Sequence, residues 1–162
     1  MGSEDGRAEL RGLYSDPAQP LTVAVGQAFD LVSMPAAVGH AALGALRARR
    51  VRLGPVVADS RRSVMRVGFL VAPTPRTAPG PVARTADPDR AALGEWAGRL
   101  GGTLGVRVGG QGSTATLPPL LPWRGWLHWL VAPGVEAGRW TPSGALLAVL
   151  SALSERTGAR TL

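Results

Sequence analysis

The sequence contains no cysteine, lysine, isoleucine or asparagine. Without cysteine, the chain forms neither disulfides nor thiolate metal sites. It has no apolar run approaching the roughly 20 residues that a membrane-spanning helix requires. Its acidic, polar N-terminus, MGSEDGRAEL, does not follow the pattern of a signal peptide. Together these absences predict a cytoplasmic protein without membrane association.

Because lysine is absent, all 18 basic residues are arginine, and against 11 acidic residues they give a net charge of +7. Alanine, glycine and proline are also abundant, a composition typical of a high-GC bacterium. Arginine by itself is therefore a weaker sign of phosphate recognition than it would otherwise be. A positive charge of this size still favours an anionic partner. The alternative is a solvated basic surface without a partner.

Apolar periodicity predicts a single mixed domain, and 162 residues with 45% hydrophobic content suffice for one buried core. Strand patterns occur at residues 21–25, 28–34, 53–59, 64–72, 104–108, 113–117 and 126–132. Helical spacing occurs at residues 35–50, 89–100 and 143–156. The order predicts an α+β fold, a mostly antiparallel mixed sheet with about three helices. We expect a flexible segment at 1–20, the domain at 21–158, and within it a Pro-rich mobile loop at 73–88.

The stretch from Leu104 to Leu120, LGVRVGGQGSTATLPPL, carries the strongest local signals. Its first strand runs into Gly109 and Gly110, and glycine permits a tight turn or the close approach of another backbone. A second strand ends at a double proline, because proline cannot donate to a sheet ladder. We interpret this stretch as a Gly-rich strand pair beside a functional site.

The segment VRVGGQGSTATLPPL resembles primase-polymerase domains, in which a strand with an acid-x-Arg motif leads into a Gly-Gly turn, a strand and a Pro-Pro. Residues 25–35 resemble the first metal-binding strand of that family, 53–56 and 67–73 its central hairpin, and 124–133 the strand after the Pro-Pro. In particular, the chain resembles the small, divergent proteins of high-GC bacteria known as bifunctional DNA primase/polymerase, N-terminal (archaeo-eukaryotic primase-like). The resemblance implies the primase-polymerase catalytic core as the fold.

The catalysis of this family requires carboxylates that hold two divalent metals. At the corresponding positions this chain has Ser33, Pro35 and Gly105, none of which supplies a carboxylate. Asp30 lies nearby, but strand alternation directs it to the opposite face from Ser33. We therefore expect a catalytically degenerate domain, a pseudoenzyme without metal or cofactor. The opposing hypothesis is residual DNA primase/polymerase activity.

An Arg-rich face is the main candidate site, because guanidinium groups contact phosphates and aromatic side chains stack on bases. The residues expected to bind nucleic acid or a nucleotide are Arg61, Arg62, Arg66, Arg107, Gly109, Gly110, Arg124 and Trp126. The arginines at 47–52, which end the first helix, are expected to join the arginines at 61–66. His40 and His128 are isolated and give no metal signature.

Single-stranded nucleic acid or a nucleotide is accordingly the expected partner. Two other hypotheses remain from the sequence. In the first, the domain is a protein-interaction or regulatory scaffold with no nucleic-acid role, using the Pro-rich loop or the last helix to contact a protein partner. In the second, an accessory protein binds a nucleotide in the former catalytic cleft without turning it over.

Overall fold

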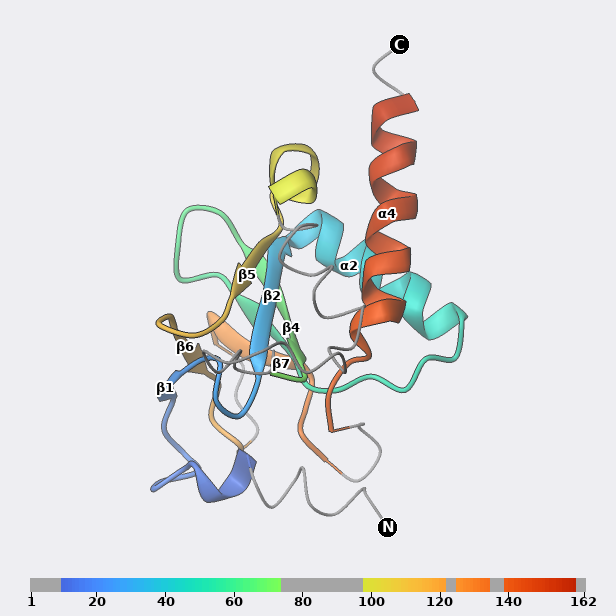
Figure 1. Ribbon diagram of the computed structural model, residues 1–162. Coiled ribbons are helices and arrows are strands. Elements are labelled where there is room, and N and C mark those ends of the chain that lie inside the picture. Colours follow the sequence, from blue (N-terminus) through green and yellow to red (C-terminus); the bar gives the residue numbers. More distant parts are fainter. Residues whose placement is uncertain (1–9, 74–97, 122–124, 135–138, 160–162) are drawn as a thin grey trace, which may run out of the picture.

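The computed structural model describes residues 10–73, 98–121, 125–134 and 139–159. Five strands form the main sheet in the order β5-β2-β4-β3-β7: β2 (Asp30–Pro35), β3 (Val56–Asp59), β4 (Arg66–Val71), β5 (Arg107–Gly109) and β7 (Leu127–Val131). A second sheet pairs β1 (Leu21–Ala24) with β6 (Thr114–Leu117). The pairings within both sheets are antiparallel (Figure 1), and the predicted α+β class is confirmed.

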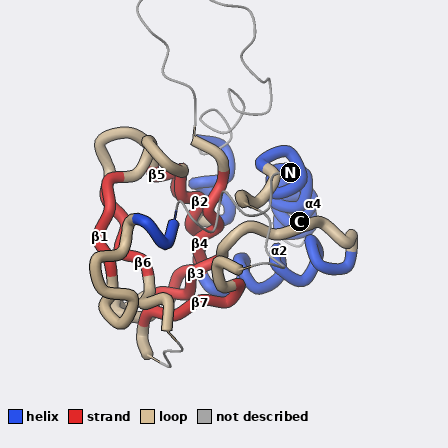
Figure 2. Tube along the Cα trace, turned by 90° about the horizontal axis from the view of Figure 1, so that it is seen from below, coloured by secondary structure: helices blue, strands red, loops and turns tan. Residues whose placement is uncertain are grey.

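The main sheet separates two hydrophobic cores. Helices α2 (Ala36–Ala48) and α4 (Ser143–Ala159) lie on one side of the strands, and β1 and β6 lie on the other (Figure 2). Alternation along β2 sends Val32 and Met34 into the core beneath the helices and leaves Leu31 and Ser33 on the opposite face. The predicted hairpin of β3 and β4 is confirmed, and β4 lies in the middle of the sheet, as its continuous apolar run indicated.

Helix α2 packs closely on the sheet through small residues. Ala42 and Leu46 are fully buried against the strands. At Gly39, a Cβ atom would lie 2.3 Å from Cβ of Val67 in β4, so only glycine fits there. The helix ends before Arg50, whose φ of +55° cannot continue a right-handed helix.

The second core lies under β1 and β6 and includes the fully buried Leu10 and Phe29. The double proline ends β6, as predicted, and both of its carbonyls accept hydrogen bonds. The hydroxyl of Tyr14 donates to Pro118 O at 2.6 Å, and Nε1 of Trp129 donates to Pro119 O at 3.0 Å. Leu10 and Tyr14, which belong to the segment predicted from the sequence to be flexible, therefore contribute to this core.

The boundaries around residue 104 differ from the prediction. Residues 98–104 are helical, so the helix continues through Gly101 and Gly102 instead of ending there, and the strand expected from residue 104 starts at Arg107. The reason is Gly105, whose φ of +65° and N–H bond to Gly101 O (3.2 Å) terminate the helix. Most of the helix predicted at 89–100, and all but the first residue of the 73–88 loop, lie outside the described residues.

The Gly-rich stretch is not a strand pair. β5 pairs with β2, with Ser33 opposite Arg107, whereas β6 pairs with β1 in the other sheet. The turn at 110–112 carries the chain from one sheet to the other and packs against the turn at Gly26. A Cβ atom on Gly26 would lie 2.4 Å from the backbone nitrogen of Gln111, and its φ is +97°. Glycine there is required by the close approach of the two turns.

Candidate anion-binding cleft

A cleft of about 360 Å³ lies between the main sheet and the β1–β6 sheet. Its floor is the face of the main sheet that points away from α2 and α4, with Leu31, Val57 and Gly68 among its residues. Its wall is β6, including Thr114 and Thr116. Gly68 is buried in the middle of the floor, where the side chain of Leu31 lies over it.

Arginine dominates the charge of the cleft. Among the described residues, Arg61, Arg62, Arg66 and Arg107 line it against the single carboxylate of Asp59, a formal balance of four positive charges and one negative, or +3. The first two arginines lie on the β3–β4 connection, and the others begin β4 and β5. Four of the eight residues that the sequence predicted for the site are thus brought together here.

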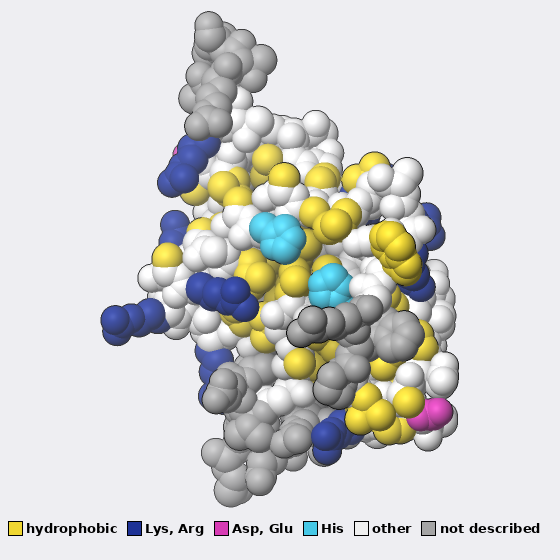
Figure 3. All heavy atoms as spheres, turned by 180° about the vertical axis from the view of Figure 1, so that it is seen from behind, with side chains coloured by type: hydrophobic (Ala, Val, Ile, Leu, Met, Phe, Trp, Pro, Cys, Tyr) yellow, Lys and Arg dark blue, Asp and Glu magenta, His cyan; other side chains and the backbone are white. Residues whose placement is uncertain are grey.

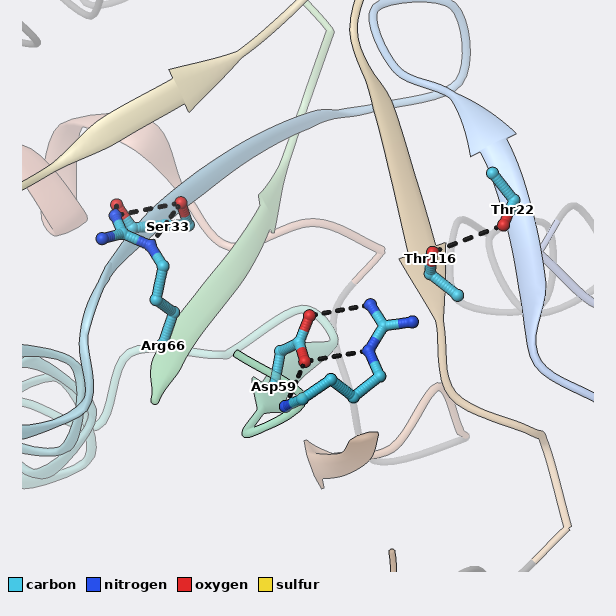
Figure 4. A network of polar contacts seen from close by, with 6 residues as sticks. Thr22, Ser33, Asp59, Arg66 and Thr116 are labelled. Carbon is cyan, nitrogen blue, oxygen red and sulfur yellow. Dashed lines mark hydrogen bonds and ion pairs between the residues drawn. The ribbon is translucent and has the colours of Figure 1, made fainter. Parts of the chain in front are cut away.

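One of these arginines is neutralised by an ion pair. Arg61 Nη2 donates to Asp59 Oδ2 at 2.8 Å, Nε donates to Oδ1 at 3.0 Å, and the backbone N–H of Arg61 also donates to Oδ1 (Figure 4). These bonds to Arg61 hold the pKa of Asp59 below its usual range. In the part of the chain that the structure describes, no carboxylate lies within ion-pair distance of Arg62, Arg66 or Arg107.

Arg66 is held in place by β2 and by the segment before β5. Its Nη2 donates to Ser33 O at 2.9 Å, with longer contacts to Ser33 Oγ (Figure 4). The same Nη2 also donates to Gly105 O at 2.8 Å. Burial, and then the neighbouring charge of Arg107, lower the pKa of the Arg66 guanidinium. The side chain is thus a partly desolvated cation beside a second cation.

The three positions at which the resemblance implies carboxylates are close together in space. Arg66 contacts both Ser33 and Gly105, and a Cβ atom on Gly105 would lie 3.0 Å from Cγ of Pro35. Asp30 is buried in line with the helix-side residues of β2 and does not line the cleft. Within the described residues, no group of three or more His, Asp or Glu side chains is placed to hold a metal ion. The residues at these positions do not fit the divalent metals of the family.

The other predicted site residues lie elsewhere. Gly109 pairs with Leu31 in the sheet, and Gly110 accepts a hydrogen bond from Ser113 Oγ at 2.6 Å; neither is among the described residues that line the cleft. Trp126 precedes β7 with its side chain 74% exposed, and its carbonyl accepts a 2.6 Å bond from the N–H of Ser60. Its backbone is therefore next to the arginine-bearing connection. Arg124 lies outside the described residues.

The arginines at 47–52 do not join the cleft, contrary to prediction. Helix α2 starts beside β4, where Ala36 N–H donates to Met65 O at 2.9 Å, and then runs along the helix-side face of the sheet to its other end. Figure 1 shows the end of α2 and the β3–β4 connection on opposite sides of the molecule. A helix of 13 residues measures about 20 Å at 1.5 Å per residue, which explains the separation.

The two histidines share one face of the molecule, where hydrophobic side chains lie between them (Figure 3). His40 is exposed on α2, and Nδ1 of His128 contacts Gly125 O at 3.0 Å. Two further residues of the cleft, Asp59 and Thr116, were not singled out from the sequence. The spacing Asp59-Ser60-Arg61, which suits an Asx-type turn with an ion pair, was the available signal for the first of them.

Comparison of the chain with protein families, curated proteins and solved structures finds no match. None of the helices in the described part of the chain combines the length and the apolar character needed to cross a membrane.

The function therefore has to be inferred from the cleft itself. An open groove with surplus arginine and hydroxyl groups can bind an anionic ligand, and Asp59 is the one carboxylate among the described residues that line it.

Proposed function

We propose that the protein binds single-stranded nucleic acid in the arginine-lined cleft and does not transfer nucleotides. The observation that carries this proposal is a surplus of guanidinium groups on one side of the sheet. Arg62, Arg66 and Arg107 line the cleft without a carboxylate partner among the residues that the structure describes. Guanidinium forks match phosphate oxygens, and each phosphate contact releases a counterion.

The size of the cleft and the exposed indole favour a single strand. A volume of about 360 Å³ is at the lower end of small-ligand sites, which measure roughly 300–1,000 Å³, so the cleft suits one nucleotide unit and not a duplex. Trp126 is highly exposed beside the β3–β4 connection, and its indole offers a face on which an unpaired base can stack. Such stacking contributes about 1–3 kcal/mol per base.

We propose the absence of nucleotidyl transfer because the residues at the expected metal-binding positions are not metal ligands. Serine, proline and glycine at positions 33, 35 and 105 supply no carboxylate, and two-metal transfer needs several. Extension of a primed template with Mg²⁺ or Mn²⁺ by the purified protein, but not by the Arg66→Gln, Arg107→Gln double variant purified in the same way, would overturn this part of the proposal.

Fluorescence anisotropy with labelled single- and double-stranded oligonucleotides across a salt series tests the binding. We expect the Arg62→Ala, Arg107→Ala double variant to bind more weakly and to reduce the log–log salt slope by about 1.4, since each single-strand phosphate contact contributes roughly 0.7. The matched control is Arg47→Ala, Arg49→Ala, which removes the same charge from the exposed end of α2. Equal weakening by both pairs would mean a general basic surface and would overturn the proposal.

The same titration with Trp126→Ala tests the preference for a single strand. Stacking predicts roughly a tenfold loss of affinity or more for the single strand and little change for the duplex. If the protein bound duplex at least as tightly as single strand, or if Trp126→Ala weakened both alike, the single-strand assignment would be wrong. No binding at physiological salt would instead favour a protein-interaction scaffold.

A further inference from the structure

The guanidinium of Arg66 occupies the place between β2 and the segment before β5. It bonds to the carbonyls of Ser33 and Gly105, on two segments that are far apart in sequence. Arg107 begins β5 directly opposite Ser33 and also lines the cleft. Two cations from adjacent parts of the sheet thus converge on the same end of the cleft.

Arg66 retains donors for a ligand after it has been positioned. In the described part of the chain, its hydrogen bonds use Nε and Nη2, which leaves both N–H groups of Nη1 unused. Arg107 is exposed, and no hydrogen bond or ion pair restrains its guanidinium among the described residues. One fixed fork and one adjustable fork are suited to the tetrahedral oxygens of a phosphate group.

We propose that Arg66 and Arg107 form a phosphate-binding site that operates without a metal ion. The inference deepens the proposed function and rests on it, because it assigns the end of the same cleft where a phosphate of the strand or of a nucleotide is held. The fixed guanidinium supplies the positive charge that a divalent cation supplies in a carboxylate site.

The local backbone makes this arrangement difficult to convert into a carboxylate site. Gly105 has a φ of +65°, which L-residues rarely adopt, and a Cβ atom there would press on the ring of Pro35 at 3.0–3.2 Å. An acidic side chain at position 33 would meet the guanidinium of Arg66 at hydrogen-bond distance and neutralise it. The backbone at Gly105 and the guanidinium of Arg66 therefore favour an anion bound directly by the arginines over a metal ion bound by carboxylates.

Electrostatics favour the same ligand. Two guanidinium groups beside each other repel, and the lowered pKa of Arg66 has the charge of Arg107 as one of its causes, after burial. A phosphate between them compensates both charges in a partly desolvated setting, where charge-assisted hydrogen bonds are strong. Asp59 is already paired with Arg61, so it does not supply that compensation.

Isothermal titration calorimetry of the full chain with inorganic pyrophosphate, in excess EDTA and in excess Mg²⁺, tests the site. We expect saturable binding in EDTA that Mg²⁺ does not strengthen. Arg107→Gln should weaken it roughly tenfold or more, as should Ser33→Asp, which places a competing carboxylate on Arg66. The control Arg49→Gln removes one charge at the far end of α2 and should leave the affinity unchanged.

Arg66→Lys adds a test of the fork, because lysine keeps the charge but cannot span Ser33, Gly105 and a ligand together. Its fold is checked by thermal melting; if it unfolds, Arg107→Gln and Ser33→Asp still decide the matter. Binding that requires Mg²⁺, binding insensitive to both of those variants, or no binding of pyrophosphate overturns the site. Oligonucleotide binding in that event leaves the proposed function standing, whereas pyrophosphate binding without oligonucleotide binding refutes the proposed function alone.

Discussion

At the scale of single residues, the cleft depends on how a few charges are paired. Arg61 and Asp59 neutralise each other on the β3–β4 connection, whereas Arg62 and Arg107 have no carboxylate partner within the described ranges. A basic sequence alone would not distinguish these cases. Under the proposed function, the ligand is therefore bound by the guanidinium groups outside this ion pair, and the carboxylate of Asp59 weakens that binding.

Replacing Asp59 by asparagine should therefore tighten the binding of a single-stranded oligonucleotide. The change raises the formal charge of the cleft from +3 to +4 and releases Arg61, for an expected gain of roughly twofold to fivefold at low salt. Since Arg61 lowers the pKa of Asp59, the carboxylate is ionised throughout the neutral range, and the gain should not depend on pH there.

The control for this substitution is Glu155→Gln, which removes one negative charge from the exposed surface of α4. Anisotropy titrations of both variants are compared at the same ionic strength. Weaker or unchanged binding of Asp59→Asn, or an equal gain in both variants, would mean that the cleft is not where the strand binds.

At the scale of elements, the position of α2 on the sheet depends on glycine at one point of contact. Gly39 faces Val67 of β4, whereas Gly44, in the same helix, is exposed and has nothing within 4 Å of its Cβ position. Helix propensity is improved equally at both sites by alanine, so the two substitutions differ only in packing. The difference in stability between the two variants therefore measures the effect of the close helix–strand packing, separately from helix propensity.

Gly44→Ala should stabilise the fold by about 0.5–1 kcal/mol, the usual gain over glycine in a helix. Gly39→Ala should destabilise it by about 1–3 kcal/mol, because its Cβ atom would lie 2.3 Å from a buried side chain and would force α2 away from the sheet. Urea unfolding of both variants measures the free energies. Equal stabilisation by the two substitutions would refute the close packing of α2 on β4.

At the scale of the whole molecule, the β1–β6 sheet is held over the main sheet by side chains from distant segments. Tyr14 is the one tyrosine of the chain, and its hydroxyl reaches Pro118, 104 residues away in the sequence. Trp129 holds the adjacent proline from β7. Because these bonds tie the residues after position 10 and strand β7 to the wall of the cleft, their loss would affect global unfolding.

Tyr14 should make the stability of the molecule sensitive to alkali. Burial raises the pKa of Tyr14 above the value of about 10 at which a tyrosine in the unfolded chain titrates. Above that pH the unfolded state loses its proton first, so the free energy of unfolding should fall as pH rises. Urea unfolding from pH 8 to about 11 checks this.

The variant Tyr14→Phe is the control for the alkaline effect. It should cost about 1 kcal/mol at neutral pH, for the lost hydrogen bond, and should show a flatter decline at high pH. Tyrosinate absorbance in the folded wild-type protein reports on this side chain alone. A titration midpoint near 10 without unfolding would contradict the role assigned to Tyr14.

The sequence by itself determined the α+β class and the approximate positions of β2, β3, β4, α2 and α4, because the alternation along β2, the apolar runs of β3 and β4 and the helical spacing are local properties. It also indicated the β3–β4 hairpin, whose strands are joined by a short connection. The sequence also supplied the candidate arginines, Arg66 and Arg107 among them, but it did not show which of them lie close together.

Only the tertiary structure decided how these elements are paired and which charges share a cleft. The partners of β5 and β6 are strands about 75–95 residues away, and no local pattern specifies such contacts. The bonds from Arg66 to Ser33 and Gly105 depend on such contacts, and the separation of 47–52 from the cleft depends on how α2 packs on the sheet. Burial and electrostatic pairing are properties of neighbours in space, which is the physical reason that the site required the fold.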